Sequence, residues 1–387
     1  MLQHPKRLKN DIIWGLLELG IDVDRYPGKV PINDIDYDEV EKLSITLDSY
    51  NIVISQNFSA TIAEACFGKR IPYISWIYDS PQSQAYRKEA AYDVCYKFMF
   101  DRKGKERLCK AGIDKVYHQP LAANITMTSG LNITDDDVKR YSSDVSFVGS
   151  MYKTSYYRNL YEGLPLPMKE HFDNIVADNF CKWNGNSIYN TLNKAEIDAI
   201  YQIMNKNGLG ESYIPLEYLI ETLMFSIELS GEERKNLLNV ASEIGDVAIY
   251  THKPDEFRAE LKGRVNPPVD SETEIYKVYY SSKINLNISL HSIETGLPQR
   301  IFDIMSVGGF VLSNYQDEIG ELFDIGRDIE VYRDIDEYKE KIKYYLSHDE
   351  QRIRMGVNGY LRVKDNYTYP IILKKMIDLV CKDWGIQ

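Results

Sequence analysis

Short apolar segments alternate with amphipathic ones along most of the chain. In the first third, apolar runs predict strands at 51–55, 71–77, 96–100 and 115–118. Apolar residues at helical spacing predict helices over 8–19 and 59–67. Strands that alternate with helices at this spacing form parallel sheets covered on both faces. The strand that usually precedes the first helix of such a unit is missing before Leu8.

The same alternation returns in the second half of the chain. Strands are predicted at 145–148, 247–251, 284–288, 310–313 and 329–332, and helices at 274–282, 298–306, 316–323 and from 334 to the end. Residues 153–243 contain several helical runs and few strand-like ones, which predicts a helical insertion. The segment after His118 is rich in Pro, Gly, Asn and Thr and contains an acidic triplet, a composition typical of linkers.

These patterns predict an α/β protein with two Rossmann-like domains. The first domain spans 1–125, a linker spans 126–143, and the second domain spans 144–365 with its helical insertion at about 153–243. A length of 387 residues agrees with two domains, because a single hydrophobic core seldom serves a chain this long.

Charge and cysteine content narrow the class of protein. The net charge is -12, with 46 basic against 58 acidic residues, which argues against binding to nucleic acid. The five cysteines are odd in number, show no CxxC spacing and favour a reducing compartment. No run resembles a signal peptide or a transmembrane segment, so we expect a cytoplasmic protein.

The segment Ser282–Gln316 carries the richest candidate chemistry. A strand ends at Ile288, a polar loop follows, and Pro298 opens a helix whose free N–H groups suit a diphosphate. Arg300 could pair with phosphate oxygen atoms, and Asp303 could accept hydrogen bonds from a ribose. The alternative is a surface ion pair between these two side chains. The candidate nucleotide-binding residues of this segment are Gly296, Leu297, Gln299, Arg300 and Asp303.

Two more strand ends in the second domain are expected at the same edge, because ligands of wound parallel sheets bind at the carboxyl ends of strands. Gly149 and Ser150 follow the strand 145–148. Tyr250 and Thr251 end the strand 247–251, where a nucleobase could stack or bond.

In the first domain, polar residues follow two strands. Asn57 and Ser59 follow the strand 51–55, and Asp79 follows the strand 71–77. We expect Asp79 to act as general base or to bind an acceptor hydroxyl; the alternative is an Asx turn before Pro81. The acidic runs Asp34–Asp38 and Asp135–Asp137 lack the spacing of metal ligands and are expected to be solvated turns.

The run VYYSSKINLNISLHSIETGLPQRIFDIMSVGGFVLSNYQDEIGELF resembles the donor domain of CgeB-like (spore-maturation type) bacterial glycosyltransferases. NFSATIAEACFGKRIPYISWIYDSPQ, VSFVGSMY and VAIYTH resemble other parts of the same family. The resemblance implies a GT-B fold, with two Rossmann domains facing across a cleft, a nucleotide-sugar co-substrate, no further cofactor and no obligatory metal. It also implies donor-site roles for Lys283 and Asn287, and a C-terminal helix, 366–387, that packs back on the first domain.

The sequence therefore predicts a glycosyltransferase that moves a hexosyl group from a nucleotide sugar, a UDP-sugar in the first instance, to a hydroxyl of a protein, glycan or small molecule. Arg300 and Asp79 are the expected catalytic residues. Two alternatives stay open: a GT-B-like sugar-nucleotide epimerase or phosphorylase, and a non-catalytic nucleotide-binding module. Glu294 and Asp303 are too far apart in sequence for the acidic pair of many retaining enzymes, so the stereochemistry is left open.

Overall fold

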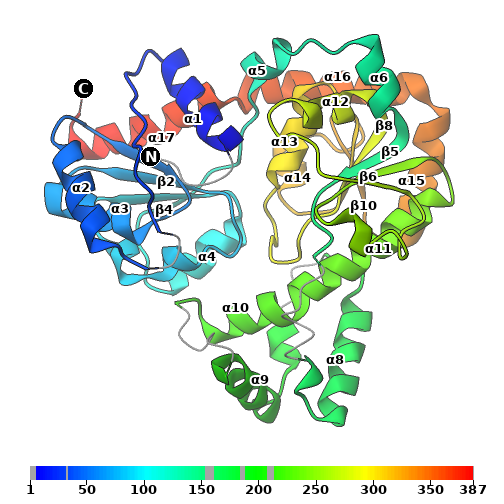
Figure 1. Ribbon diagram of the computed structural model, residues 1–387, viewed down its shortest axis with the longest axis horizontal. Helices are drawn as coiled ribbons and strands as arrows, with labels where there is room; N and C mark the ends of the chain where they lie inside the picture. Colours follow the sequence, from blue (N-terminus) through cyan, green and yellow to red (C-terminus); the bar gives the residue numbers. More distant parts are fainter. Residues whose placement is uncertain (1–5, 32–33, 153–160, 184–187, 207–212, 387) are drawn as a thin grey trace. The chain divides into compact units, whose positions relative to one another are not determined.

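The computed structural model describes residues 6–31, 34–152, 161–183, 188–206 and 213–386. The chain divides into two compact units (Figure 1). The first contains residues 1–124, 295–299 and 365–387, and the second contains 125–294 and 300–364. The start of the expected insertion, 153–160, lies outside the described residues.

The first unit is built on a four-stranded parallel sheet with the strand order β1-β2-β3-β4. Its strands are β1 (Val53–Gln56), β2 (Tyr73–Ile77), β3 (Cys95–Met99) and β4 (Val116–His118). Its helices are α1 (Lys6–Glu18), α2 (Tyr37–Leu47), α3 (Ala60–Lys69), α4 (Arg102–Lys110) and α17 (Tyr369–Trp384). All residues of β2 and β3 are buried, as expected for strands covered on both faces. No strand precedes α1 among the described residues of this unit.

The C-terminal helix α17 completes the core of the first unit. It packs against α1 and buries Tyr369, Ile372, Leu373, Met376 and Val380. The approach is close at Gly15 of α1, where a Cβ atom would lie 2.7 Å from Cδ1 of Leu373. A glycine is needed at that position because any side chain would meet α17.

The second unit contains a six-stranded parallel sheet with the order β10-β9-β8-β5-β6-β7. Its strands are β5 (Ser143–Val148), β6 (Val247–Tyr250), β7 (Arg264–Asn266), β8 (Ser282–Asn287), β9 (Val311–Asn314) and β10 (Glu330–Tyr332). Counted from its own first strand this is the order 6-5-4-1-2-3, the wound order of Rossmann domains. Strand β7 was not predicted; its three residues, Arg264–Asn266, include only one apolar side chain.

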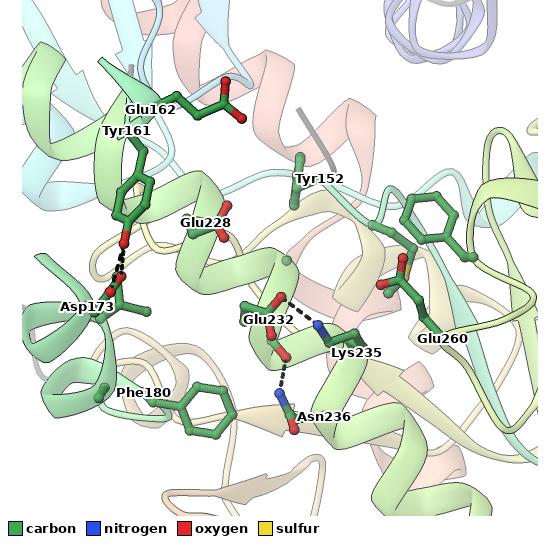
Figure 2. A pocket seen from close by; sticks show the side chains of 15 residues that line it. Tyr152, Tyr161, Glu162, Asp173, Phe180, Glu228, Glu232, Lys235, Asn236 and Glu260 are labelled. Carbon is green, nitrogen blue, oxygen red and sulfur yellow. Dashed lines mark hydrogen bonds and ion pairs between the residues drawn. The ribbon is translucent and has the colours of Figure 1, made fainter. Parts of the chain in front are cut away.

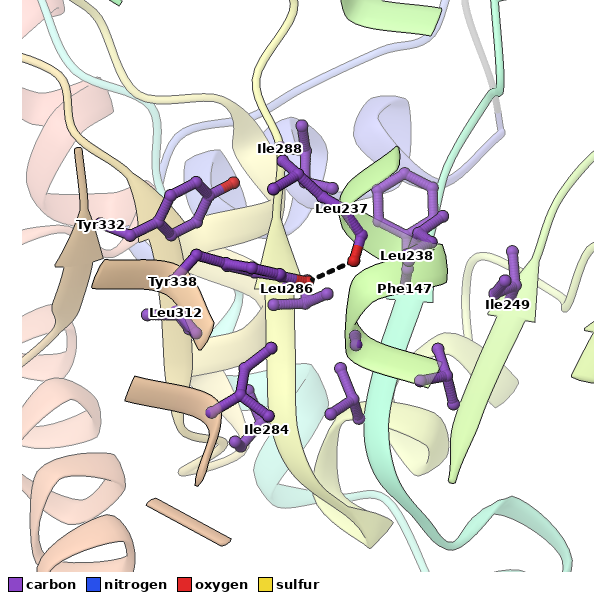
Figure 3. Close-up of a cluster of buried hydrophobic side chains, with 14 of the residues drawn as sticks. Phe147, Leu237, Leu238, Ile249, Ile284, Leu286, Ile288, Leu312, Tyr332 and Tyr338 are labelled. Atoms are coloured by element: carbon purple, nitrogen blue, oxygen red, sulfur yellow. Dashed lines mark hydrogen bonds between the residues drawn. The ribbon is translucent and has the colours of Figure 1, made fainter. Parts of the chain in front are cut away.

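Some helices of the second unit flank this sheet, and others lie in the segment between β5 and β6 (Figure 1). They are α5 (Ile125–Ser129), α6 (Asp135–Tyr141), α8 (Leu166–Asn179), α9 (Lys194–Lys206), α10 (Leu216–Ile220), α11 (Ile227–Ser242), α12 (Glu274–Ser281), α13 (Gln299–Ser306), α14 (Ile319–Leu322), α15 (Ile335–Ser347) and α16 (Asp349–Asn366). Helices α8 to α11 lie in the segment predicted as a helical insertion. Figure 3 shows the core between the sheet and α11 and α15, where Tyr338 donates a hydrogen bond to the Leu237 carbonyl.

The two acidic runs begin helices, which corrects the expectation of solvated turns. Asp36 caps α2, its carboxylate accepting from the Glu39 N–H. Thr134 and Asp137 cap α6 reciprocally, in the segment expected to be a linker. Carboxylates are favoured at these positions because they accept from the unpaired N–H groups of the first helical turn.

None of the helices in the described ranges combines the length and the hydropathy that crossing a lipid bilayer requires.

Candidate functional site

The strand order of the second unit directs attention to β5 and β8. These two strands are hydrogen-bonded neighbours, and the chain winds away from them in opposite directions along the sheet. In parallel sheets of this kind, a crevice forms outside the carboxyl ends of the strands at which the winding reverses. The candidate site is therefore at the ends of β5 and β8, at Val148 and Asn287.

Arg300 is held at this edge by a buried amide. Its Nη1 donates to Oδ1 of Asn287 over 3.0 Å. Asn287 is fully buried, and its Nδ2 donates to the hydroxyls of Ser289 and Ser313, which fixes the direction of its Oδ1. The Arg300 guanidinium also lies 5.3 Å from the centre of the Phe147 ring. These contacts orient a positive charge at the carboxyl end of the sheet.

Gly149 leaves room for that guanidinium. A Cβ atom at Gly149 would lie 2.6 Å from Nη2 of Arg300, so a side chain there would displace the guanidinium. The Gly149 N–H continues the sheet by donating to the Tyr250 carbonyl over 3.0 Å. Ser150 is exposed, and its hydroxyl accepts from the Tyr152 N–H. The structure thus brings together four predicted residues: Gly149, Ser150, Asn287 and Arg300.

Lys283 lies at the opposite edge of the sheet, which corrects its assignment to the donor site. It is the second residue of β8, whereas Asn287 is the last. Its Nζ pairs with Oδ1 of Asp144, near the start of β5, over 2.8 Å. A strand advances about 3.3 Å per residue, so Lys283 is a full strand length away from Arg300 and its partners.

Tyr250 is buried, which corrects the expectation that its ring stacks on a base. The ring packs in a small cluster with Tyr141, Ala248 and Val278, and burial raises its pKa. A ring enclosed by helices α6 and α12 offers no free face to a ligand.

Two other predicted residues are also buried. Thr251 follows β6, and its N–H donates to the Asn266 carbonyl over 3.2 Å. Asp303 lies one turn into α13, and its main-chain carbonyl accepts from the Ser306 hydroxyl. Neither contact requires a ligand, so the predicted nucleotide-binding roles of Thr251 and Asp303 stay predictions.

The last part of the loop before α13, from Thr295, belongs to the first unit. A Cβ atom at Gly296 would lie 2.7 Å from Cα of Asp101, so this glycine serves a close backbone approach. Leu297 is buried, and Nε2 of Gln299 donates to the Ala122 carbonyl over 2.7 Å. The predicted segment around α13 is therefore divided: residues 295–299 belong to the first unit, and the residues on either side, Arg300 among them, belong to the second.

Asp79 forms a paired site with Asn57 in the first unit. Asn57 adopts a positive φ of 59° and follows β1, and its Nδ2 donates to Oδ2 of Asp79 over 2.6 Å. The Asn57 Oδ1 accepts from the N–H groups of Tyr78 and Asp79, so the amide cannot turn without losing these bonds. The arrangement fixes one carboxylate oxygen of Asp79 at the carboxyl end of β2.

Ser59 has a structural contact. It is the N-cap of α3, its hydroxyl accepts from the Ile62 N–H, and its own N–H donates to the Tyr73 hydroxyl. Capping the start of α3 is sufficient to explain a buried serine hydroxyl at this position. Its predicted acceptor-side role stays a prediction.

Sequence reasoning missed Arg234, which lies 5.3 Å from the same Phe147 ring as Arg300. A signal was present in the periodicity of α11. The buried positions of this helix recur at helical spacing, and two of them, Glu233 and Arg234, are charged. A charge on a buried helix face requires a specific partner, so a charged residue at a buried helical position indicates a specific contact.

A concave region of about 850 Å³ lies beside α8 and α11 (Figure 2). Its ionisable lining is mostly acidic, and Tyr161 donates to Asp173 at one edge of it (Figure 2). The ionisable lining residues other than tyrosine are Glu162, Asp173, Glu228, Glu232, Lys235 and Glu260. This charge would repel a diphosphate, so we do not place the donor site here, although the lining includes Met151 and Tyr152 of the loop after β5.

Comparison with known families and proteins adds a partial match. Residues 234–378, less than half of the chain, match the model of the family described as "Glycosyl transferase-like". The matched part includes α11 from Arg234 onwards, β8 and Arg300. A search of curated proteins finds no match.

Among solved structures, the chain resembles Anabaena Alr3699/HepE in complex with UDP-glucose, with a TM-score of 0.50 at 10% identity. The similarity covers 89% of this chain and 82% of that one. The fold is GT-B. A glycosyltransferase from Rickettsia africae gives a TM-score of 0.49 at 10% identity over 96% of this chain and 87% of that one. The fold predicted from the sequence, with two Rossmann-like domains, is confirmed.

Proposed function

We propose that the protein is a glycosyltransferase that transfers a hexosyl group from a nucleotide sugar, a UDP-sugar in the first instance, to a hydroxyl acceptor. The observation that carries the proposal is Arg300, oriented by the buried Asn287 at the reversal point of a Rossmann sheet. The match of residues 234–378 to a glycosyl transferase-like family supports it. HepE, which shares the fold, was solved with UDP-glucose.

In this proposal Arg300 neutralises the negative charge that grows on the departing diphosphate. A guanidinium held in advance by Asn287 and Phe147 needs little reorganisation as that charge develops. Stabilisation of this kind is commonly the largest single contribution to catalysis. Asp79, held by Asn57, would bind or deprotonate the acceptor hydroxyl.

Two finer points belong to the same proposal. The resemblance of the long run around β8 and α13 favours the CgeB-like branch of these enzymes. The five cysteines are all free, which supports a reducing compartment such as the cytoplasm. The acceptor class is a protein, a glycan or a small molecule.

Arg300 and Lys283 give a matched test of the donor site. Both are basic residues of the second unit, but only Arg300 lies at the carboxyl edge of the sheet. Loss of a charged hydrogen-bonding partner weakens binding by roughly ten- to a hundred-fold, so we expect this loss of UDP-glucose affinity in Arg300→Met. Lys283→Met should bind as the wild type does. Isothermal titration of UDP-, GDP- and TDP-glucose, with a thermal-shift screen beforehand, measures both effects.

Equal affinity of wild type and Arg300→Met for the preferred donor would overturn the site assignment. Conversion of UDP-glucose without an acceptor, to another UDP-sugar, would indicate an epimerase instead. Binding without any turnover across a panel of acceptors would favour a nucleotide-binding module.

A further inference from the structure

Arg234 is a buried arginine whose charge needs an explanation. Its side chain lies on the core face of α11, and only 2% of the residue is exposed. Its neighbours on that face, Leu237, Leu238 and Ala241, belong to the hydrophobic core. An unpaired guanidinium in such a place would be strongly destabilising, so its contacts should show why it is retained.

Those contacts join two loops. Nε and Nη2 both donate to the carbonyl of Ile288, the Nε bond measuring 3.2 Å, and Nη1 donates to the carbonyl of Ser150. Ile288 directly follows β8, and Ser150 lies two residues beyond β5. These are the neighbouring strands at which the sheet reverses its winding. One rigid, planar group therefore sets the spacing of the two backbone segments that border the candidate donor site.

Aromatic rings and a glycine hold Arg234 in this position. Its guanidinium carbon lies 4.3 Å from the centre of the Tyr152 ring and 5.3 Å from that of Phe147. Gly231, one turn earlier in α11, lets the helix approach the loop after β5, because a Cβ atom there would lie 3.1 Å from the Met151 carbonyl oxygen. The contact between helix and loop is built around this arginine.

Arg234 also lies close to the second positive charge of the site. Its pKa is lowered to about 10, mainly by burial, and the charge of Arg300 contributes to the lowering. Both guanidinium carbons lie 5.3 Å from the centre of the Phe147 ring. The two positive charges repel each other, as the effect of Arg300 on the pKa of Arg234 indicates, and a bound anion beside them would relieve that repulsion.

We propose that Arg234 is a positioning residue of the donor site. It fixes the loops after β5 and β8 so that Gly149, Ser150 and Arg300 hold a diphosphate, and its charge makes that region favourable for an anion. The inference rests on the proposed function, since it assigns Arg234 to the same donor site. Lysine cannot replace it, because a single ammonium lacks the planar fork that reaches both carbonyls and stacks on both rings.

Arg352 provides a matched control. It is a buried arginine of the same unit, and its Nη1 donates to the Tyr345 carbonyl over 2.7 Å. Its ion pair with Asp349 lies on helix α16, away from the loops after β5 and β8. A purely structural role for Arg234 predicts that Arg234→Met and Arg352→Met behave alike.

The experiment compares the wild type, Arg234→Lys, Arg234→Met and Arg352→Met by thermal unfolding and by titration with UDP and UDP-glucose. We expect both methionine variants to melt earlier. Affinity for both ligands should fall by roughly ten-fold or more in the two Arg234 variants, as for other lost charged contacts. Arg352→Met should keep wild-type affinity. Arg234→Lys retains a charge at the site, so its affinity for UDP and UDP-glucose decides the question if Arg234→Met does not fold.

Wild-type affinity in a folded Arg234 variant would overturn this inference while leaving the proposed function intact. An equal loss in Arg352→Met would also overturn it, because the effect would then be general destabilisation. A wild-type protein that binds no nucleotide or nucleotide sugar would reject the proposed function and, with it, this role.

Discussion

At the scale of single residues, two buried asparagine amides orient the ionisable side chains of the candidate site. Asn287 holds Arg300 because two serine hydroxyls fix the Asn287 amide. Asn57 holds Asp79 in a similar way, with its carbonyl oxygen committed to two backbone N–H groups. In both places a buried amide with little freedom to turn directs an ionisable group at the carboxyl end of a strand.

This geometry gives a prediction for Asp79. In Asp79→Asn the amide can no longer take a proton from an acceptor hydroxyl, and general-base contributions are typically about 10²–10⁴-fold. We expect the rate of UDP release from UDP-glucose in the presence of an acceptor to fall within that range. Donor affinity should stay unchanged, because Arg300 and its partners belong to the other unit.

Asp93→Asn is a suitable control, since Asp93 forms an exposed ion pair with Arg70. It should lose little activity. Full turnover by Asp79→Asn would remove Asp79 from the mechanism, and loss of donor affinity would show that it acts on binding instead.

At the scale of elements, caps and ion pairs stabilise a helix that the hydrophobic pattern does not predict. Helix α6 has only seven residues, yet Asp137 accepts from the Thr134 N–H and hydroxyl and pairs with Lys277 of α12 over 2.9 Å. The backbone hydrogen bond and the Lys277 charge hold the pKa of Asp137 down at about 2. The same carboxylate thus starts one helix and ties it to the next.

The pH dependence of stability follows from that shift. A carboxyl group whose folded pKa lies below its unfolded value of about 3.9 stabilises the fold above that value, and the contribution disappears as the pH falls towards 2. We expect Asp137→Asn to lower the melting temperature at neutral pH. The gap to the wild type should narrow as the pH falls from about 4 towards 2 in thermal melts recorded by circular dichroism.

Asp255→Asn tests whether any lost surface charge has this effect, because Asp255 forms an exposed pair with Arg258. Its melting temperature should follow the wild type throughout. A constant gap between Asp137→Asn and the wild type at all pH values would contradict the assignment.

At the scale of the whole molecule, the first unit is formed by three separate segments of the chain. Residues 295–299 and 365–387 belong to it, although the second unit lies between them and residue 124 in sequence. Helix α17 supplies five buried side chains to the first unit. The first unit is therefore complete only when the end of the chain is present.

Leu373 tests this division. Its side chain is fully buried beside Gly15, and Leu→Ala changes at such sites cost about 2–5 kcal/mol. We expect Leu373→Ala to destabilise the first unit in scanning calorimetry and to leave UDP-glucose affinity unchanged. Ile353→Ala, at a residue of α16 that is 61% exposed, should change neither. A parallel loss of donor affinity in Leu373→Ala would show that the two units do not respond independently.

The sequence by itself determined the alternation of strands and helices, the two parallel sheets and most element positions. These depend on apolar runs and helical periodicity, which are local in the chain. It also named Gly149, Arg300, Asn57 and Asp79 as candidates, because each follows a readable strand or starts a readable helix, and the family resemblance added Asn287. Short elements without such a signal, β7 and α6 among them, were missed.

The tertiary structure alone decided which of the candidates share a site. Lys283 and Asn287 belong to one strand, but they lie at its opposite ends. Gly296 and Arg300 are four residues apart, yet the two units divide them. Arg234 reaches Ser150 and Ile288 only because the sheet places β5 next to β8. Such contacts depend on strand order and register, which pair residues far apart in the chain and leave no mark in a local pattern.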